Sequence, residues 1–167
     1  MLWRISALLW AVFIFYLSTA TFGEVTSQSF LARALAFFHL ALSPAGFGTA
    51  HKVSRKLAHL TEYGIFALLL HRCFPIQGAL RGERPRAFLS VLAAAAYSLT
   101  DEFHQVFVPG RHGCVTDCAI DSTGAALAML LILGYRTFRE EAAGVWSEKP
   151  SVHSSPFHGH LDAADES

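Results

Sequence analysis

Charged side chains are scarce in this sequence, and neither sign is in excess. Asp, Glu, Lys and Arg together form 16% of the 167 residues, and the formal net charge is +0 when histidine is neutral. This balance gives no support to nucleic-acid binding as a bulk property, because such binding draws on an excess of positive charge. With 53% hydrophobic residues, the chain is too apolar for an ordinary soluble domain. The composition therefore indicates a membrane protein with a single domain.

Cysteine and familiar nucleophile motifs are also sparse. The chain has three cysteines and no Gly-x-Ser-x-Gly motif of the kind that marks a serine hydrolase. Cys114 and Cys118 have a spacing that zinc sites permit, and His104 and His112 lie nearby, but no second matching pair follows. A disulfide between the two cysteines is the other interpretation. We predict neither a metal ion nor a cofactor.

Four apolar segments are expected to cross the membrane as helices. They run from Leu2 to about Ala20, from about Lys56 to Phe74, from Ala87 to about Val108, and from about Asp117 to Tyr135. A signal peptide is an alternative for the first segment, which we interpret as a retained helix because further spans follow. Gly124, Ala125 and Ala128 predict a packed helix contact in the fourth segment, since small residues let helices approach closely. The expected fold class is an all-α, integral membrane four-helix bundle.

The segments outside these spans are of two kinds. Residues 21–54, between the first and second spans, contain several glycines and a proline, which predicts a connection. Within it, Ser29–Leu42 has apolar residues at helical spacing. We expect a short interfacial helix there, which either lies at the membrane surface or covers the end of the bundle. Beyond Glu140 the composition is polar, which predicts a disordered cytoplasmic tail. The expected domains are a four-span membrane domain, 1–139, and a tail, 140–167.

The distribution of arginines predicts an orientation. With four spans, Arg4, the arginines after the second span and those after the fourth span fall on one side, which should be cytoplasmic. Both termini would then lie in the cytoplasm. Arg55 and Lys56 fall on the outer side, against the usual bias, so they call for a partner. The carboxylates that end the third span lie on that same side.

Polar side chains recur at helical spacing near the outer ends of the spans. Lys56, His59 and Tyr63 share one helical face, and Arg55, His59 and Glu62 share a second face that meets the first at His59. The polar residues at comparable places in the next two segments are Asp101, Glu102, His104, Gln105, Asp117 and Asp121. Ionisable groups at membrane depth are costly and seldom face lipid, so we expect these residues to form one shared site.

Several of these residues also have a purely structural interpretation. Asp121 is expected to pair with Arg111, Lys56 or His59, and an ion-pair network of this kind need not have any function. Asp117 has the position of an N-cap for the fourth helix. Arg111 either binds an external carboxylate or phosphate or clamps a carboxylate of the chain itself. His59 is either a general acid or base or a hydrogen-bonding core residue.

The same residues carry a resemblance to a known family. The stretches from Arg55 to Gly64 and from Asp101 to Arg111, followed by Asp117, Asp121 and Gly124, resemble the VanZ-like family, with a layout that covers roughly residues 2–135. The resemblance implies a small, multi-pass protein of the bacterial inner (plasma) membrane. It also implies a link to the cell envelope, since the best-known relative is associated with resistance to the glycopeptide antibiotic teicoplanin. The motif positions present here are Lys56, His59, Glu62, Tyr63, Asp101, Glu102, Gln105, Pro109, Gly110, Arg111, Asp117, Asp121 and Gly124.

Our hypothesis is that the shared site recognises an anionic lipid-linked or cell-wall headgroup. The expected binding residues are Lys56, His59, Glu62, Tyr63, Asp101, Glu102, Gln105, Arg111, Asp117 and Asp121. The expected partners are membrane lipid and a lipid-linked cell-wall precursor, with no nucleic acid, and the sequence leaves the oligomeric state open. A membrane-embedded acid/base or metal-assisted enzyme acting on a lipid-linked substrate is the alternative, and a proton-coupled carrier is a third hypothesis.

Overall fold

A computed structural model describes residues 1–19, 21, 23–109 and 113–147, and within these ranges all regular structure is helical. The elements are α1 (Leu2–Ser18), α2 (Glu24–Phe37), α3 (Pro44–Cys73), the 3₁₀ turn η2 (Gly78–Leu80), α4 (Glu83–Val106) and α5 (Val115–Ser147). The prediction of an all-α fold is therefore confirmed. Judged by length and composition alone, Val115–Ala143 is the one helical stretch among the described residues that could cross a membrane. Leu2–Ser18 is apolar as well, but it is shorter. Four membrane crossings are thus not shown.

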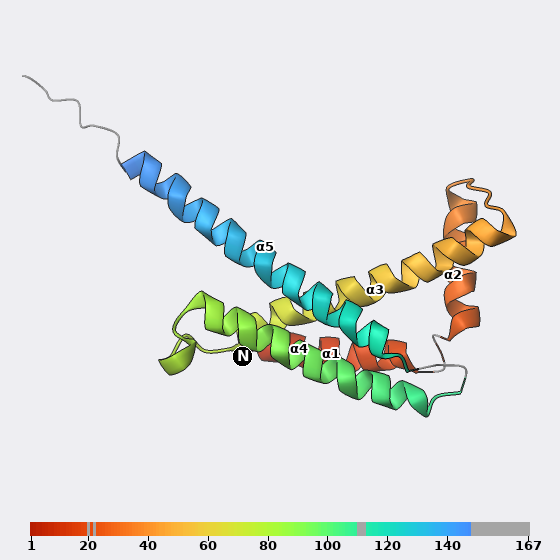
Figure 1. Ribbon diagram of the computed structural model, residues 1–167, viewed down its shortest axis with the longest axis horizontal. Coiled ribbons are helices and arrows are strands. Elements are labelled where there is room, and N and C mark those ends of the chain that lie inside the picture. The colour runs from red at the N-terminus through yellow and green to blue at the C-terminus, as the bar shows by residue number, and fades with distance from the viewer. Residues whose placement is uncertain (20, 22, 110–112, 148–167) are drawn as a thin grey trace, which may run out of the picture.

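α3 is the central element, because it packs against α1, α4 and α5. Figure 1 shows α3 and α5 crossing as an X, with α4 and α1 running along one side of the crossing. α2 stands beside the N-terminal part of α3, and the C-terminal part of α5 extends beyond the other helices. The buried apolar core lies around this crossing and consists of Ile14, Tyr63, Phe66, Ala67, Ala87, Ala94, Ala125 and Met129.

The crossing of α3 and α5 depends on two glycines. A Cβ atom at Gly124 would overlap the backbone carbonyl group of Leu60, and one at Gly64 would lie 3.3 Å from the backbone oxygen of Gly124 and 3.7 Å from the Cβ of Ala128. The two backbones therefore touch where neither residue has a side chain. This confirms the helix contact that the small residues Gly124, Ala125 and Ala128 predict.

The surface and the interior have an unusual distribution of polarity. Large apolar side chains of α1, α4 and α5 are exposed; Phe88 is 71% exposed and Leu131 is 75% exposed. The interior, by contrast, contains many polar and charged side chains. Those that are buried are Ser18, His51, His71, Arg86, Ser90, Ser98, Asp101, Glu102, Gln105 and Asp121. An apolar exterior of this extent marks a surface that contacts lipid or another apolar partner rather than water.

The helix α3 begins at Pro44, not near Lys56 as the sequence indicated. Ser43 is the N-cap, and its hydroxyl accepts a hydrogen bond from the backbone N–H of Gly46 at 3.2 Å. Proline is well tolerated at the first helical position, because its missing N–H would have no partner there. Gly46 and Gly48, which looked like loop residues, therefore lie in the first turns of α3.

The other helices also differ from the predicted segments at their ends. The short helix predicted at Ser29–Leu42 is present as α2, which starts at Glu24 and ends at Phe37. α4 starts at Glu83 rather than Ala87, because Pro85 lies in its first turn, where proline costs no hydrogen bond. α5 starts at Val115 and continues to Ser147, so the predicted tail boundary at residue 140 falls inside a helix. The remainder of that predicted tail, 148–167, lies outside the described residues.

Candidate functional site

Asp121 is the centre of a polar cluster between three helices. Its side chain is fully buried, and its Oδ1 lies 3.1 Å from Nδ1 of His59 on α3. Its other oxygen, Oδ2, accepts a hydrogen bond of 2.6 Å from the hydroxyl of Ser98 on α4. Both oxygens of this carboxylate are therefore engaged, each by a different helix. Of the three partners expected for Asp121, the structure shows His59.

The end of α4 adds a second group of carboxylates to the cluster. Gln105 donates from Nε2 to Asp101 Oδ2 at 3.1 Å and to Glu102 Oε1 at 3.3 Å. The backbone N–H of Cys114 donates to Glu102 Oε2 at 2.7 Å. Gly113 makes this contact possible, because a Cβ there would overlap the backbone oxygen of Glu102. The chain before α5 thus folds back onto the end of α4 and holds Glu102 in place.

Two cavities border the cluster. The inner cavity has a volume of about 140 Å³ and lies between α1, α3 and α4; its polar lining includes Ser18, Glu62, Asp101 and Gln105. The outer cavity has a volume of about 420 Å³ and lies between α2, α3 and the start of α5. Arg55 and His59 line both cavities. The polar interior is therefore accessible from the end of the molecule where α2 stands.

The outer cavity carries a positive edge. The residues that line it are Glu24, Gln28, Gly48, His51, Lys52, Arg55, Lys56, His59, Cys114 and Asp117. Lys52, Arg55 and Lys56 come from successive turns of α3, and none of these three forms an ion pair with a carboxylate in the described part of the chain. The cavity is thus lined by three cations that have no ion-pair partner among the described residues, and by the carboxylates of Glu24 and Asp117.

The predicted site residues fall into distinct environments. His59, Asp101, Glu102, Gln105 and Asp121 come together as the cluster. The other predicted residues are Lys56 and Asp117 at the outer cavity, Glu62 at the inner cavity, Tyr63 in the core, and Arg111, which lies outside the described residues. The hydroxyl of Tyr63 has no hydrogen-bond partner in the described structure, and its ring packs edge-on against Phe66.

The structure also tests two structural interpretations from the sequence: Asp117 as a helix N-cap, and a disulfide between Cys114 and Cys118. Asp117 is not the N-cap of the fourth helix, because α5 begins at Val115 and Asp117 lies in its first turn, where a carboxylate favours the helix dipole. Cys114 and Cys118 are free cysteines, and Cys73 is free as well. The Sγ of Cys114 instead lies 2.9 Å from Oγ1 of Thr116.

Sequence reasoning missed Ser98, although a signal for it was present. Ser98, Asp101 and Gln105 are spaced i, i+3 and i+7, so they share one face of α4. Serine is common on membrane helices, and nothing in the sequence distinguishes Ser98 from Ser90, which is equally buried but bonds to the backbone oxygen of Arg86. Ser98 is recognised as part of the cluster only when the structure places Asp121, on another helix, beside it.

A second polar cluster, also missed, lies at the opposite end of the molecule. Arg86 donates to Glu83 Oε1 at 3.1 Å and to the backbone oxygen of His71 at 2.7 Å, and Arg136 donates to the same Glu83 oxygen at 2.6 Å. Nε2 of His71 and Oε2 of Glu83 are 3.2 Å apart, close enough for an ion pair when the ring is protonated but not aligned as a hydrogen bond. Arg86 is therefore a buried structural residue, not a loop arginine.

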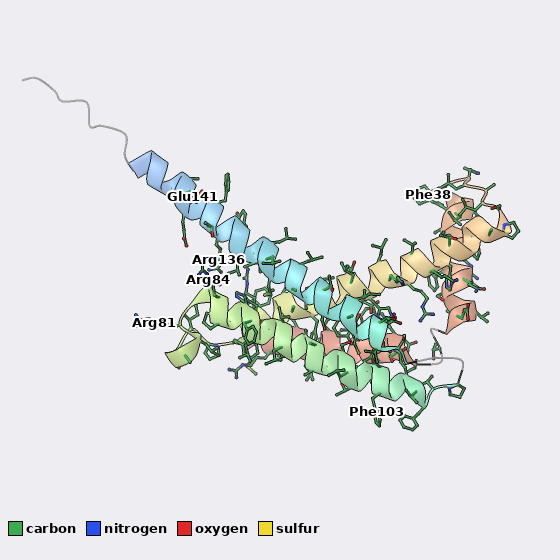
Figure 2. The ribbon with its side chains drawn as sticks, in the orientation of Figure 1. Phe38, Arg81, Arg84, Phe103, Arg136 and Glu141 are labelled. Atoms are coloured by element: carbon green, nitrogen blue, oxygen red, sulfur yellow. The ribbon has the colours of Figure 1, made fainter. Side chains whose placement is uncertain are left out.

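This end is rich in arginine. Figure 2 labels Arg81, Arg84 and Arg136 there, whereas Phe103 lies towards the other end of α4. The two ends of the helices thus differ in charge: one has many arginines, two of which pair with Glu83, and the other has buried carboxylates and a histidine.

Comparison with known protein families matches residues 3–138 to the VanZ/LLP1 family. The match spans most of the chain, so the protein belongs to this family, as the motif residues indicated. Proteins of the VanZ family are generally membrane proteins, and the apolar helix Val115–Ala143 agrees with that class. Neither a curated protein nor a solved structure matches the chain significantly.

Proposed function

We propose that this protein crosses the bacterial inner membrane four times, with α1, α3, α4 and α5, and recognises an anionic lipid-linked or cell-wall headgroup at its outer end. The lengths of the helices support the crossings. α4 has 24 residues, which corresponds to about 36 Å at about 1.5 Å per residue, against a hydrocarbon core of about 30 Å. The exposed apolar side chains of α1, α4 and α5 supply the surface that lipid requires.

The arginines support an orientation for these crossings. Arg81, Arg84 and Arg136 lie at the end that carries the Glu83 cluster, and short cytoplasmic segments of membrane proteins are enriched in arginine and lysine. Both termini and that end are then cytoplasmic. The outer cavity and the buried carboxylates face the opposite side, which is the side of the cell wall.

The observation that carries the proposed recognition is the positive edge of the outer cavity. Lys52, Arg55 and Lys56 line it without pairing to a carboxylate in the described chain. Arginine and lysine that remain unpaired beside a cavity can bind phosphate or carboxylate oxygens with charge-assisted hydrogen bonds. His59 connects this edge to the buried cluster through Asp121.

Binding of a short-chain phospholipid to the full chain in detergent tests this proposal. Wild type should bind dioctanoyl phosphatidylglycerol more tightly than the zwitterionic phosphatidylcholine of the same chain length. The double variant Arg55→Gln/Lys56→Gln should weaken binding of the anionic lipid by about tenfold or more, since charged hydrogen bonds typically contribute about 1.5–3 kcal/mol each. Arg33→Gln is the matched control, because Arg33 is an exposed arginine on α2 outside the cavity lining. Equal affinity for the two lipids, or an equal loss in the control, would contradict the proposal.

The proposed link to glycopeptide resistance has a separate test. A deletion strain should become more susceptible to teicoplanin, and wild type should restore growth while Arg55→Gln/Lys56→Gln should not. If the double variant restores growth as well as wild type, the cavity edge has no part in this phenotype.

A further inference from the structure

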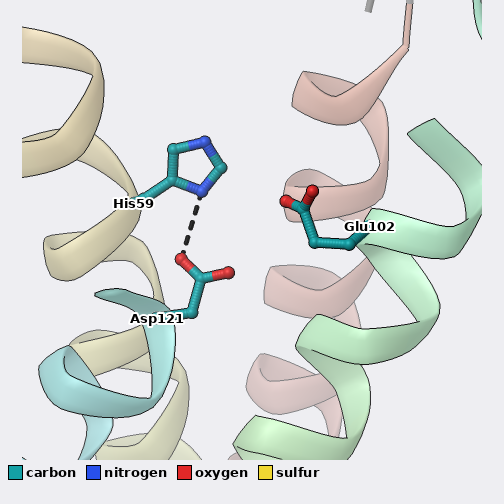
Figure 3. A group of neighbouring side chains, drawn as sticks. All are labelled: His59, Glu102 and Asp121. Carbon is teal, nitrogen blue, oxygen red and sulfur yellow. Dashed lines mark hydrogen bonds and ion pairs between the residues drawn. The ribbon is translucent and has the colours of Figure 1, made fainter. Parts of the chain in front are cut away.

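The cluster around Asp121 brings three metal-binding side chains together from three helices. His59 on α3, Glu102 on α4 and Asp121 on α5 each offer one donor atom, and these atoms all lie within 4.8 Å of one another. Figure 3 shows the imidazole of His59 above the carboxylate of Asp121, with the carboxylate of Glu102 facing them from α4. Residues far apart in the sequence therefore converge on one point in the interior.

The spacing of the donors is close to that of a bound ion. Bonds of about 2.1 Å in a tetrahedral zinc site place neighbouring donor atoms about 3.4 Å apart. Nδ1 of His59 and Oδ1 of Asp121 are 3.1 Å apart. The donor atom of Glu102 lies within 4.8 Å of the other two, so Glu102 has to move closer, exchanging its hydrogen bond with Gln105 for a bond to the ion.

Each carboxylate in this group is also supported from outside. Ser98 holds Oδ2 of Asp121 at 2.6 Å, and the backbone N–H of Cys114 holds Oε2 of Glu102 at 2.7 Å. One oxygen of each carboxylate is thereby fixed. Of the other two oxygens, Oδ1 of Asp121 lies beside His59, and Oε1 of Glu102 accepts a longer hydrogen bond from Gln105 at 3.3 Å. Hydrogen bonds of this kind orient the ligands in protein metal sites.

A second observation favours a cation at this place. Asp101 is 3% exposed, lines the inner cavity together with His59, and has no hydrogen-bond partner for its Oδ1 among the described residues. Among the described residues, no lysine or arginine pairs with Asp101, Glu102 or Asp121, and His59 is the ionisable base that contacts this group. Buried carboxylates without compensating charge are costly. A divalent cation would offset that cost.

We propose that His59, Glu102 and Asp121 bind one divalent cation, with Zn²⁺ the best fit to one imidazole and two carboxylates. The ion takes Nδ1 of His59 in its neutral form. His59 also lines the inner cavity, whose volume of about 140 Å³ is large enough to hold water. This donor set does not include Cys114 and Cys118, the two cysteines whose spacing in the sequence is compatible with a zinc site. The proposal does not depend on recognition of a headgroup, because the ion needs no ligand from outside the chain.

Metal titration of the full chain tests this site. Protein purified in detergent and stripped with a chelator should bind one Zn²⁺ per chain by calorimetry, and Mn²⁺ more weakly. His59→Gln, Glu102→Gln and Asp121→Asn should each weaken binding by at least about tenfold, because even supporting residues of metal sites contribute that much. Glu141→Gln, an identical chemical change at an exposed residue of α5, should not alter it. Equal binding by wild type and the triple variant would overturn the proposal, since the ion would then bind elsewhere.

A spectroscopic measurement on wild type keeps the test decisive if the variants do not fold. X-ray absorption at the zinc edge should show one imidazole and otherwise oxygen ligands at about 2.0–2.2 Å. Sulfur at about 2.3 Å would assign the ion to the cysteines, and two or more imidazoles would assign it to histidines elsewhere in the chain. Either result would overturn the proposed ligand set without bearing on the outer cavity.

Discussion

Asp121 has no solvent exposure, so its charge depends on the few groups that touch it. In the described structure its polar partners are His59, at 3.1 Å, and Ser98, at 2.6 Å. A buried carboxylate that loses a donor keeps its desolvation cost and loses the bond that offset it. Ser98 is therefore a sensitive position although its side chain is small.

Ser98→Ala should destabilise the protein by about 1–3 kcal/mol, because Oδ2 of Asp121 then lacks a donor. Ser90→Ala is the matched control on the same helix: Ser90 is equally buried, but its hydroxyl bonds to a backbone oxygen of its own helix, and alanine is the better helix former. The control should change stability by less than about 1 kcal/mol. Denaturation of the two variants in mixed detergent measures the difference. Equal losses would show that the Ser98–Asp121 bond contributes nothing beyond the volume of the hydroxyl.

The sequence predicted most of the residues in this cluster, because polar groups in apolar segments are rare and their helical spacing is easily read. It did not predict which of them touch. Lys56 was one of three partners named for Asp121, yet it lies at the exposed edge of the outer cavity, and His59 takes the place beside Asp121. Whether Lys56 or His59 contacts Asp121 depends on how α3 is rotated about its axis relative to α5. That rotation is set by the glycines at the crossing, not by the charges.

The crossing of α3 and α5 places His59 and Asp121 opposite each other, so its geometry controls the site. Gly124 has the backbone of Leu60 where a Cβ would lie. Backbone cannot move aside as a flexible side chain can. Any side chain at Gly124 therefore forces the helices apart at the level of the cluster.

Gly124→Ala should destabilise the protein by about 1–3 kcal/mol through overpacking, even though alanine favours a helix. Gly134→Ala is the control on the same helix, because nothing lies within 4 Å of a Cβ at Gly134. There the same change should be neutral or stabilise by up to about 1 kcal/mol. Thermal unfolding followed by circular dichroism in detergent distinguishes the two. Similar midpoints for both variants would mean that the helices do not cross at Gly124.

Helix ends were harder to predict than helices. Gly46 and Gly48 are typical of loops, yet they lie in α3, because Ser43 caps the helix and Pro44 starts it. Pro85 is of a residue type that breaks helices, yet it lies in the first turn of α4. In both cases a residue that disrupts the middle of a helix is harmless near its start, and only the position of the cap decides between the two.

The molecule as a whole has polar ends of different composition and an apolar circumference. The Glu83 cluster with its arginines occupies one end, and the cluster around Asp121 occupies the other. The arginines in the sequence predict this asymmetry, because they follow the second and the fourth apolar segments and so fall at the same end. The sequence could not predict that Arg86 is buried, because the partners of Arg86 come from α3 and from Glu83 in the first turn of α4.

Two native cysteines lie at opposite ends and provide a test of orientation. Cys114 is exposed beside the outer cavity, and Cys73 ends α3 near the arginine-rich end. In intact cells a membrane-impermeant maleimide should label Cys114 in a Cys73→Ser/Cys118→Ser variant. It should label Cys73 in a Cys114→Ser/Cys118→Ser variant only after the membrane is permeabilised.

Detergent-solubilised protein is the control for reactivity, because both thiols should then react. The reverse pattern, with Cys73 labelled from outside and Cys114 protected, would show that the cavities face the cytoplasm. Recognition of an outer-leaflet headgroup would then be wrong. The proposed metal site would be unaffected, because its ligands and its cavity are the same in either orientation.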